Sequence, residues 1–583
     1  MRIFSPRRLV DRAAGEVSLT HVNPIVPALI LTCCLAACGG GGSGGGSGGS
    51  TPVPEPTVTT PILDPTTLAL LDSVPGPRVT NVEPKQLTSS FAHPGHSDAS
   101  LELSSDCSGF AGTTIRRNLF DLSSAHFNQI LDHKINCDLN ENSTYTVTAK
   151  STRSNEAASV SELFISSGVT NPSGLAVINQ FDLPRDTVND MFLGYVTGAL
   201  YEDLDLPSGI ESLIRDLILD IAEANWSNLV DPDSIYGVTS QQISYLSRHP
   251  DGSPSTELSA AITFPVIPPA SGFVARDRVI LLTHATGSTP GNLNDTDAWY
   301  ILANLFASRG YLVIAPDNYG RGRSGGGPEN APETYLMANR TALNTLDLVN
   351  LVLEGRAYEG VYNGSNVAII GYSQGGHSAI GLYLLFETQG PENLSIREVY
   401  SGGGPHNLYQ TVRGVMQHLD RSCEDGVYCR YVDEDTTVPF ATDRIFPGFL
   451  SYTDTGLSLD DVVTGETINP EFVTAFLGND PELDDFKAML QLSSFTQIVS
   501  AEDNFSGSNA QVHLYHSPFD RLVPFANTSE LAAVLEPAVA VDFHENRCNS
   551  DSYKAIFNLT DKVGVLHTLC GLSVLDDALA DFK

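Results

Sequence analysis

The segment Gly371–Gly375 offers the clearest chemistry in the chain, because it places a serine between two glycines in the pattern Gly-x-Ser-x-Gly. It follows the apolar run 366–370 and precedes a stretch with helical periodicity that extends to about Glu387. This pattern between a strand and a helix predicts a strained turn that exposes the serine hydroxyl. The N-terminus of the helix would stabilise negative charge that develops nearby. We therefore predict that Ser373 is a nucleophile; a turn whose glycines serve packing alone is the alternative.

Such a serine requires a general base, and the base requires an acid that orients it. Asp520 is the candidate acid. It follows the apolar stretch Val512–His516, which we expect to be a strand, and it precedes Val523-Pro524 in a turn-forming sequence. A carboxylate at the end of this strand could fix the orientation of an imidazole. An aspartate that only caps a turn or a helix is the alternative interpretation.

Two histidines lie further along the chain, and either could be the base. His567 precedes a helical stretch that we expect from Leu572 to the end of the chain, so a loop would carry it. His544 directly follows the expected strand Ala538–Phe543. We predict that His567 is the base, and His544 is its rival.

From about residue 243 onward, apolar strand-like runs alternate with amphipathic helices. This alternation predicts an α/β fold with a mainly parallel central sheet and helices on both faces. The expected strands are 243–247, 260–266, 279–283, 312–315, 366–370, 396–400, 512–516 and 538–543. The expected helices are 186–200, 208–224, 299–309, 333–353 and 375–387, with a further helix at the C-terminus.

The alternation stops between about His406 and Asn509. This segment contains acidic stretches, a close pair of cysteines, and helices that we expect near Pro470–Leu477 and Pro481–Leu490. It separates two expected core strands by about a hundred residues. An insertion at that point would lie over the carboxyl edge of the sheet, where α/β proteins bind ligands. We therefore expect residues 406–509 to form a cap.

These motifs together resemble the α/β-hydrolase superfamily, and in particular its secretory lipase and esterase group, over about residues 237–583. The resemblance is carried by 371–377, Ala315-Pro-Asp317, Asp520 with Val523-Pro524, His567, and the helix that begins at Glu333. It implies the α/β-hydrolase fold and a catalytic triad of Ser373, Asp520 and His567 in that chain order.

The resemblance also implies two backbone N–H groups that would bind an oxyanion. Gln374, immediately after the nucleophile, would supply one. The loop His284–Gly287 follows the expected strand Val279–Thr283 and is similar to the His-Gly-x motif of the superfamily. Ala285 stands where glycine is usual in that motif, and we assign the second donor to Thr286.

Such a site would hydrolyse carboxylic esters by acyl transfer through an acyl-enzyme intermediate. A large cap favours a bulky apolar substrate, such as a lipid ester or an aliphatic polyester. A serine peptidase would use the same residues, and a surface adhesion or binding protein on a silent hydrolase fold is the non-enzymatic alternative. No Walker or dinucleotide-binding sequence occurs in a suitable context, so we expect no cofactor.

Three other features have simple interpretations. Residues 315–324 are expected to form a scaffold turn rather than a phosphate cradle. His377, just inside the helix after the nucleophile, is expected to pack or to form a hydrogen bond. His513 and His516 lie on one expected strand and suggest a metal pair, but no third ligand is apparent, so we predict no metal site.

The first 37 residues have the features of a signal peptide. A basic region with four arginines precedes an apolar run from Ile25 to Ala37. Leu35–Gly39 resembles the lipobox of bacterial lipoproteins, which implies cleavage before Cys38 and a lipid on its thiol. A simple secretory signal with a chance cysteine is the alternative. We expect a lipid-anchored protein of the bacterial cell envelope, with the outer membrane preferred, that faces the periplasm or the cell surface.

Residues 38–75 are the expected tether between this anchor and the folded protein. Residues 39–50 are all Gly or Ser and form a flexible coil, whereas 51–75 are rich in Pro and Thr and hence more extended.

Residues 76–168 are rich in Ser and Thr, and 143–149 show the period-two alternation of a strand. Tyr145 resembles the corner tyrosine of immunoglobulin-like sandwiches. We predict a small β-rich, immunoglobulin-like domain here, or a β-rich extension without a fold of its own. The hydrolase domain would then occupy 169–583.

Six of the nine cysteines remain after the signal and the lipid site are removed. An even number in an exported protein predicts disulfides. Metal ligation is the alternative, but no pair has the spacing or the neighbouring histidines of a zinc site. The expected pairs are Cys107–Cys137, Cys423–Cys429 and Cys548–Cys570.

The chain is strongly acidic, with 32 Lys and Arg against 69 Asp and Glu and a formal net charge of −37. This charge argues against nucleic acid as a partner, because phosphates would be repelled. It also disfavours electrostatic docking on anionic lipid. A solvated acidic surface is the expected role, and recruitment of a cationic substrate is the alternative.

Overall fold

The computed structural model describes most of the chain after residue 174 and isolated strands before it. The chain forms two units, Met1–Thr59 and Thr60–Lys583, and all the described residues belong to the second unit. The predicted signal peptide and Cys38 therefore lie outside the described residues. The described residues are 69–72, 77–78, 86–94, 101–105, 108–115, 128–138, 143–151, 157–165, 175–204, 225–230, 235–247, 256–268, 272–325, 331–354, 358, 360–389, 394–423, 426–430, 432–452, 455–478, 480–497, 508–549 and 564–582.

The segment from 69 to 165 contains strands that pair in two antiparallel sheets. One sheet has the order β1-β3-β6-β5, with β2 beside β3, and the other has the order β4-β7-β8. The expected strand 143–149 lies within β7, whereas the immunoglobulin-like assignment stays a prediction. Cys107, and with it the predicted Cys107–Cys137 bridge, lies outside the described residues. The strands are β1 (Ala69–Asp72), β2 (Pro77–Arg78), β3 (Gln86–Pro94), β4 (Leu101–Ser105), β5 (Ser108–Ile115), β6 (Asn128–Asp138), β7 (Ser143–Ser151) and β8 (Ala157–Ile165).

The central sheet has nine strands in the order β19-β18-β15-β14-β12-β13-β11-β10-β9. The strands from β19 to β13 run parallel to one another, and β11, β10 and β9 extend the sheet antiparallel. The strands are β9 (Leu175–Leu183), β10 (Gly237–Ser247), β11 (Thr256–Val266), β12 (Arg276–Thr283), β13 (Leu312–Pro316), β14 (Tyr362–Tyr372), β15 (Ser395–Gly402), β18 (Gln511–Tyr515) and β19 (Ala540–Phe543). The predicted mainly parallel sheet is confirmed, and β9 is an addition that the sequence did not predict.

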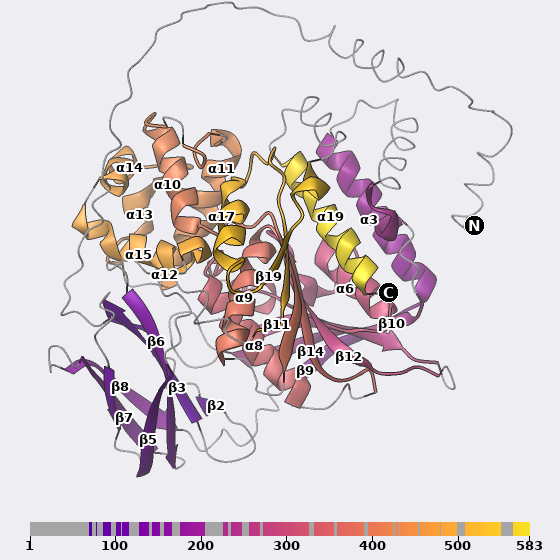
Figure 1. The fold of residues 1–583 in the computed structure, drawn as a ribbon, viewed down its shortest axis with the longest axis horizontal. Helices are drawn as coiled ribbons and strands as arrows, with labels where there is room; N and C mark the ends of the chain where they lie inside the picture. Colours follow the sequence, from indigo (N-terminus) through magenta and orange to yellow (C-terminus); the bar gives the residue numbers. More distant parts are fainter. Residues whose placement is uncertain are drawn as a thin grey trace, which may run out of the picture. The chain divides into compact units, whose positions relative to one another are not determined.

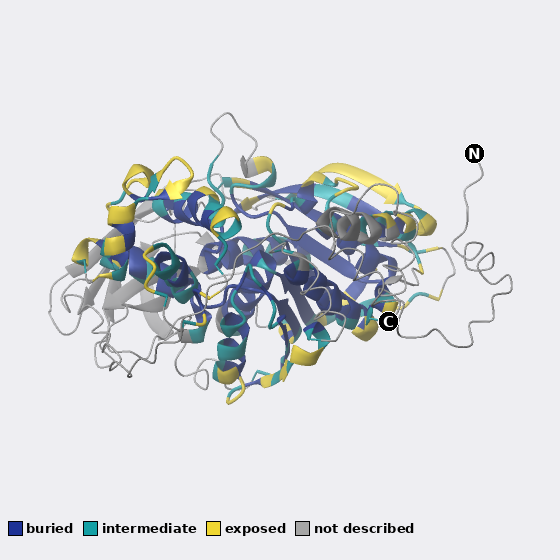
Figure 2. Cartoon of the chain, turned by 90° about the horizontal axis from the view of Figure 1, so that it is seen from above, coloured by how far each residue is buried: buried dark blue, intermediate teal, exposed yellow. Residues whose placement is uncertain are grey.

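Helices cover both faces of this sheet, and side chains that alternate along each strand divide between the two faces. In β12, Val279 and Leu281 pack into one apolar core, and Ile280 and Leu282 pack into the other. All four are fully buried, because a strand between two helical layers has no solvent-facing side. Figure 2 shows this buried interior of the sheet in dark blue.

The first core lies under α8, α9 and α17, and the second lies under α3, α6 and α19 (Figure 1). Helix α6 shows how a local sequence fixes the start of such a helix. Its N-cap, Asp297, accepts hydrogen bonds from the backbone N–H groups of Trp299 and Tyr300. The helices are α3 (Arg185–Leu204), α6 (Ala298–Ser308), α8 (Ala338–Glu354), α9 (Gln374–Gln389), α17 (Ala526–Leu535) and α19 (Val565–Asp581), with the short α5 (Ser227–Val230), α7 (Gly322–Gly325), η1 (Pro290–Asn292) and η5 (Glu545–Cys548).

The segment between β15 and β18 forms a cluster of short helices that gather beyond α17 (Figure 1). The helix expected at 470–477 is confirmed as α14, and the one expected at 481–490 corresponds to η3 and α15. The elements are α10 (Leu408–Leu419), α11 (Glu434–Phe440), η2 (Ala441–Ile445), α12 (Phe446–Tyr452), α13 (Leu459–Val462), β16 (Val463–Thr464), β17 (Thr467–Ile468), α14 (Pro470–Leu477), η3 (Pro481–Leu483), α15 (Asp484–Leu492) and η4 (Phe495–Gln497). We call this segment the cap.

Polar contacts fasten the cap to α17. The backbone N–H of Asn407 donates to the side-chain oxygen of Asn527 over 2.7 Å. The hydroxyl of Tyr428 donates to the carboxylate of Glu530 over 2.6 Å, and the side chain of Asn407 reaches the same carboxylate. These links join the base of the cap to the helix that follows the Asp520 turn.

Two helix boundaries differ from the prediction. Helix α8 begins at Ala338 and not at Glu333, because Leu336 adopts a positive φ of 58° that no helix tolerates. Helix α19 begins at Val565 and not at Leu572, so His567 lies in its first turn rather than in a loop. The helix expected at 208–224 lies outside the described residues.

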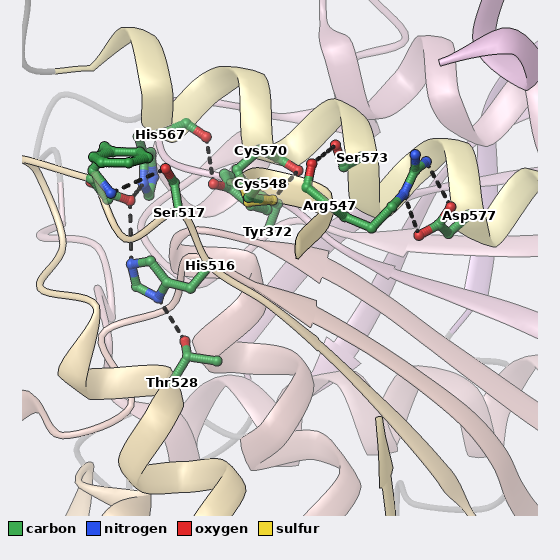
Figure 3. Close-up of a disulfide and its surroundings, with 12 residues drawn as sticks. Tyr372, His516, Ser517, Thr528, Arg547, Cys548, His567, Cys570, Ser573 and Asp577 are labelled. Atoms are coloured by element: carbon green, nitrogen blue, oxygen red, sulfur yellow. Dashed lines mark hydrogen bonds and ion pairs between the residues drawn. A yellow bond between two sulfur atoms is a disulfide. The ribbon is translucent and has the colours of Figure 1, made fainter. Parts of the chain in front are cut away.

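Two of the three predicted disulfides are present, Cys423–Cys429 and Cys548–Cys570. The second one joins η5 to α19 three residues after His567 (Figure 3). Arg547, beside Cys548, binds the carboxylates of Asp576 and Asp577 on the same helix. The disulfide and these ion pairs together hold α19 against the strand-end turn that follows β19.

No helix in the described part of the chain is long and apolar enough to cross a membrane.

A buried histidine ties α9 to the last part of the cap. His377 is fully buried, and its Nε2 donates to the backbone carbonyl of Ser493 over 2.8 Å. Its ring also packs on Phe495, with 4.6 Å between ring centroids. Burial lowers the pKa of His377 to about 4, so the ring is neutral at pH 7. The expected role in packing and hydrogen bonding is thus confirmed.

We predict that loss of the Cys548–Cys570 bridge destabilises the protein more than loss of Cys423–Cys429. The first closes a separation of 22 residues and the second one of six, and the loop-entropy model gives about 3 and about 2 kcal/mol respectively. Thermal unfolding of the Cys548→Ser/Cys570→Ser and Cys423→Ser/Cys429→Ser variants measures the difference. An equal or reversed order would contradict the assigned role of the longer bridge.

We also predict a pH-dependent stability that His377 causes. The pKa of this ring is about 4 in the folded protein and about 6.5 when exposed, so the unfolded chain binds the proton first as the pH falls. The free energy of unfolding should therefore decrease between pH 6.5 and pH 4, by of order 1 kcal/mol per pH unit. Urea unfolding at several pH values, compared with His377→Gln, isolates this contribution. A difference between the two proteins that does not change with pH would refute it.

Candidate active site

Ser373 occupies the turn between β14 and α9, at the carboxyl edge of the sheet. Its φ is +58°, a conformation that is costly for a residue with a side chain. Its backbone N–H donates to Gly402 of the neighbouring strand over 2.8 Å, and its carbonyl accepts from the N–H of His377 over 3.1 Å. The strand and the helix thus hold the serine in the strained turn that the sequence predicted.

The glycines on either side of Ser373 are required by close backbone approach. A Cβ atom at Gly371 would lie 2.1 Å from the carbonyl oxygen of Gly375, and one at Gly375 would lie 2.0 Å from that of Thr283. Both distances are far below van der Waals contact, and backbone atoms cannot move aside. The turn therefore packs directly against the end of β12, where the candidate oxyanion loop begins.

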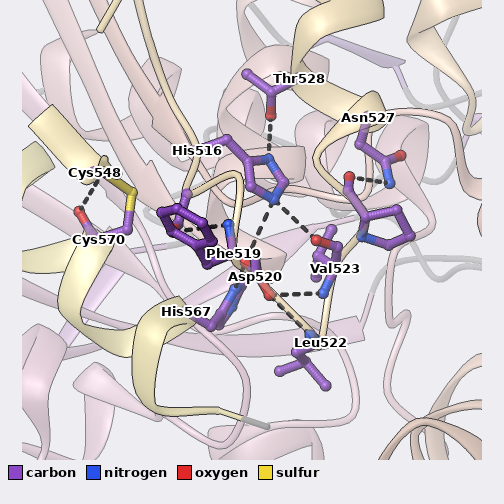
Figure 4. A network of polar contacts seen from close by, with 12 residues as sticks. His516, Phe519, Asp520, Leu522, Val523, Asn527, Thr528, Cys548, His567 and Cys570 are labelled. Carbon is purple, nitrogen blue, oxygen red and sulfur yellow. Dashed lines mark hydrogen bonds and ion pairs between the residues drawn. A yellow bond between two sulfur atoms is a disulfide. The ribbon is translucent and has the colours of Figure 1, made fainter. Parts of the chain in front are cut away.

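His567 and Asp520 form the central polar contact of the site (Figure 4). The Nδ1 of His567 lies 2.6 Å from Oδ2 of Asp520. Because a carboxylate only accepts, Nδ1 carries the proton, and the lone pair of the ring is on Nε2. That Nε2 is buried and has no hydrogen-bond partner. His567 therefore holds the tautomer that a general base requires.

Asp520 is buried and its carboxylate is saturated with donors. Oδ1 accepts from the backbone N–H groups of Leu522 and Val523, over 2.8 and 3.0 Å. Oδ2 accepts from His567 and lies 3.3 Å from Nε2 of His516. Burial on its own would raise the pKa of Asp520. The attraction of a protonated His567 and the hydrogen bonds from both histidines lower the pKa and outweigh the effect of burial. The pKa lies well below the usual range, and the carboxylate is ionised.

His516 is a member of this network that the sequence did not identify. Its Nε2 lies 3.0 Å from the carbonyl of Val523 as well as near Asp520, and both of these are acceptors. Nε2 therefore carries the proton, and Nδ1 accepts from the hydroxyl of Thr528 over 2.7 Å. His516 thus supports the acid turn and is not half of a metal pair with His513. Only the three-dimensional path of the turn brings it to Asp520.

Tyr372 connects the nucleophile turn to the imidazole. It precedes Ser373 directly, and its ring centroid lies 5.0 Å from that of His567. Its hydroxyl also donates to the backbone carbonyl of His567. Gly403, which has a φ of +58°, leaves room for the imidazole of His567. A Cβ atom at this position would lie 3.0 Å from Cε1 of that ring.

The loop after β12 lies beside the nucleophile turn. The hydroxyl of Thr283 donates to the carbonyl of Gly375 over 2.8 Å. Nε2 of His284 accepts from the N–H of Asn318 over 3.1 Å, so Nδ1 carries the proton and donates to the carbonyl of Ala285. These contacts fix the loop that carries Thr286 next to the start of α9.

The segment before α8 contacts both candidate oxyanion residues. Oε1 of Glu333 accepts from the side chain of Gln374 over 2.5 Å, and the hydroxyl of Tyr335 lies 2.8 Å from that of Thr286. From the cap, Arg444 lies 3.6 Å from the carboxylate of Glu333 and above the ring of Tyr335. We expected Glu333 and Tyr335 to lie in a helix, and that expectation did not reveal these contacts.

The structure brings Asp520 and His567 into hydrogen-bond contact and places Ser373 at the same edge of the sheet. Gln374 is the first residue of α9, so its N–H has no partner within the helix. His544, the rival base, contacts His513 and not Asp520. The catalytic roles of all five residues, Ser373, Asp520, His567, Gln374 and Thr286, stay predictions.

Part of the chain matches a known protein family. Residues 280–538 match the alpha/beta hydrolase family. No curated protein matches the sequence.

Solved structures that resemble the chain include three bacterial proteins. A putative hydrolase from Legionella pneumophila has 17% identity and a TM-score of 0.43. The match covers 70% of this chain and 98% of the Legionella chain. The rice cell wall degrading esterase LipA from Xanthomonas oryzae has 18% identity, a TM-score of 0.42 and coverages of 70% and 98%. An acetyl xylan esterase from Paenibacillus sp. R4 has 14% identity, a TM-score of 0.29 and coverages of 59% and 92%.

The family match spans the region that contains the nucleophile turn and the acid turn, and the parallel sheet with helices on both faces agrees with it. Residues 280–538 thus match the alpha/beta hydrolase family, and the chain has the α/β-hydrolase fold.

Proposed function

We propose that the protein hydrolyses carboxylic esters with Ser373, His567 and Asp520 as its catalytic triad. The observation that carries the proposal is the buried Asp520–His567 hydrogen bond of 2.6 Å, which leaves the Nε2 lone pair of His567 without a partner. The contact of Tyr372 with His567, directly before the strained Ser373, supports the proximity of base and nucleophile. A histidine so oriented next to a serine turn has the roles that acyl transfer needs.

In the proposed reaction, Ser373 attacks the ester carbonyl while Nε2 of His567 takes the hydroxyl proton. The N–H groups of Gln374 and Thr286 would bind the oxyanion. The C–O bond to the alcohol then breaks, and His567 returns the proton to the leaving oxygen. Water repeats the cycle on the acyl-enzyme and releases the acid. Asp520 stabilises the imidazolium in both steps.

The cap bears on which ester reacts. The core of the cap is apolar, and Phe446, Phe472, Phe476 and Phe486 pack against one another within it. The cap contacts α17, the helix after the Asp520 turn, and it contacts Glu333, whose carboxylate binds the side chain of Gln374. We propose a bulky apolar ester, of a lipid or an aliphatic polyester, as the substrate class.

We further propose that the protein acts in the bacterial cell envelope, held to a membrane by a lipid on Cys38. The sequence Leu35–Gly39 and the Gly/Ser tether after it support this. Disulfides are found in oxidising compartments, and the two observed bridges are consistent with export.

For the triad, we predict that Ser373→Ala lowers kcat on p-nitrophenyl esters by about 10⁵-fold and Asp520→Asn by about 10⁴-fold, because the nucleophile or its oriented base is lost. His567→Asn should match Ser373→Ala. His418→Asn is the matched control, since His418 pairs with Glu434 on the cap and should keep full activity. Assays with acyl chains of increasing length distinguish an esterase from a lipase. Turnover that survives in Ser373→Ala would refute the mechanism, and cleavage of amides but not esters would favour a peptidase.

For the anchor, we predict that Cys38→Ser moves the protein from the membrane fraction to the soluble fraction, because a thiol is needed for lipid attachment. Mass spectrometry of the N-terminal peptide should show a lipid on Cys38 of the unchanged protein. An unmodified Cys38, or cleavage elsewhere, would leave a simple secretory signal as the explanation.

A further inference from the structure

Two histidines and an aspartate meet on the outer strands of the sheet, away from the proposed triad. They are His513 on β18, Asp542 on β19 and His544 directly after β19. The sequence shows no third ligand near His513, and we therefore predicted no metal site. The fold supplies two, because β18 and β19 lie side by side at the edge of the sheet.

The register of the sheet puts all three side chains on one face. His513 is the direct partner of Asp542 across the parallel strands. His544 lies two residues beyond Asp542, and its backbone N–H donates to the carbonyl of Leu514 over 2.8 Å, which continues the pairing. Residues two apart on a strand face the same side, so the three ligand-type side chains converge.

The distances among their ligand atoms suit one small cation. Nδ1 of His513 lies 3.1 Å from Nε2 of His544, and that Nε2 lies 3.4 Å from Oδ2 of Asp542. The three atoms all lie within 4.8 Å of one another, and the described residues contain no other such group. Ligands at about 2.0–2.1 Å from a tetrahedral Zn²⁺ are about 3.3–3.4 Å apart, so small side-chain rotations close the set.

Aromatic rings hold both imidazoles in place. The ring of His513 stacks on Tyr400 and that of His544 stacks on Tyr515, each with 4.5 Å between centroids. Such packing reduces the entropy lost when a ligand is fixed. The side chain of Asp542 is 55% exposed, so a fourth position would remain open to water.

We propose that His513, Asp542 and His544 form a binding site for a divalent transition ion of the Zn²⁺ type. Two imidazoles and one carboxylate favour Zn²⁺, Ni²⁺ or Cu²⁺ over Mg²⁺ or Ca²⁺, which prefer sets of oxygen atoms. The ion replaces the proton shared between the two facing nitrogens, and each ring keeps its remaining proton on its outer nitrogen.

The bound ion would fasten the end of β19 to β18. His544 leads directly into η5, which carries Cys548 of the bridge to α19. The site would therefore strengthen the same connection that the disulfide makes, without any role in the chemistry at Ser373.

The proposal is tested by isothermal titration calorimetry, in which ZnCl₂ is titrated into the metal-free full chain. We expect saturable Zn²⁺ binding. His513→Asn or His544→Asn should weaken the affinity at least tenfold, and Asp542→Asn should weaken it without unfolding the protein. His418→Asn is the matched control, because His418 pairs with the carboxylate of Glu434 and belongs to no cluster of metal-ligand type among the described residues. In thermal unfolding, saturating Zn²⁺ should raise the Tm of the unchanged protein by roughly 2–5 °C. MgCl₂ at the same concentration should not.

An equal Zn²⁺ affinity in the unchanged chain and in all three site variants would overturn the proposal. The zinc would then bind to carboxylates elsewhere on the surface. The absence of saturable binding would overturn it too. Neither result bears on ester hydrolysis, because the readout is metal affinity. Unfolding curves of each variant without metal establish that a weakened affinity is not caused by loss of the fold.

Discussion

The buried charge of Asp520 is the constraint on which the rest of the site depends. A carboxylate removed from water costs several kcal/mol unless donors replace the lost solvent. Here two backbone N–H groups and two imidazoles supply them, and each donor comes with a structural requirement. The turn after β18 must close tightly, His516 must point back into it, and α19 must begin early enough to present His567. The disulfide and ion pairs of α19 serve this last requirement.

Local sequence predicted the parts of the molecule that local physics determines. The apolar runs of β12 to β15 and β18 are long enough and buried enough to be recognised, and the turn at Ser373 carries its own glycines. The alternation of these strands with helices predicted the parallel sheet. Asp520 was proposed as the acid because it follows a strand, and His567 as the base because it precedes a helix. The structure shows a hydrogen bond between the two side chains.

Most of the features that the sequence did not reveal depend on partners far away in the chain, and one depends on how a tight turn folds back. Glu333 is a residue type that is common at the start of a helix. Its carboxylate instead accepts hydrogen bonds from the side chains of Gln374 and Asn318, and the helix begins only at Ala338. His516 acquires its role from a turn that returns to it. His513 lacked further ligands only because Asp542 and His544 lie about thirty residues later, on the neighbouring strand. Contacts of this kind follow from the register of the sheet and not from periodicity.

The two ends of the cap are joined to each other before the cap leaves the sheet. Asn407 and Ser494 form a bridge, and the N–H of Phe495 donates to the carbonyl of His406 over 2.6 Å. The chain thus enters the cap near Asn407 and leaves it near Phe495 at almost the same point, so the length of chain between these residues places no constraint on this junction. Evolution could exchange the entire cap as a module, and with it the range of substrates, while the catalytic edge beneath stayed unchanged. The same junction offers protein engineers a natural place to graft a different cap.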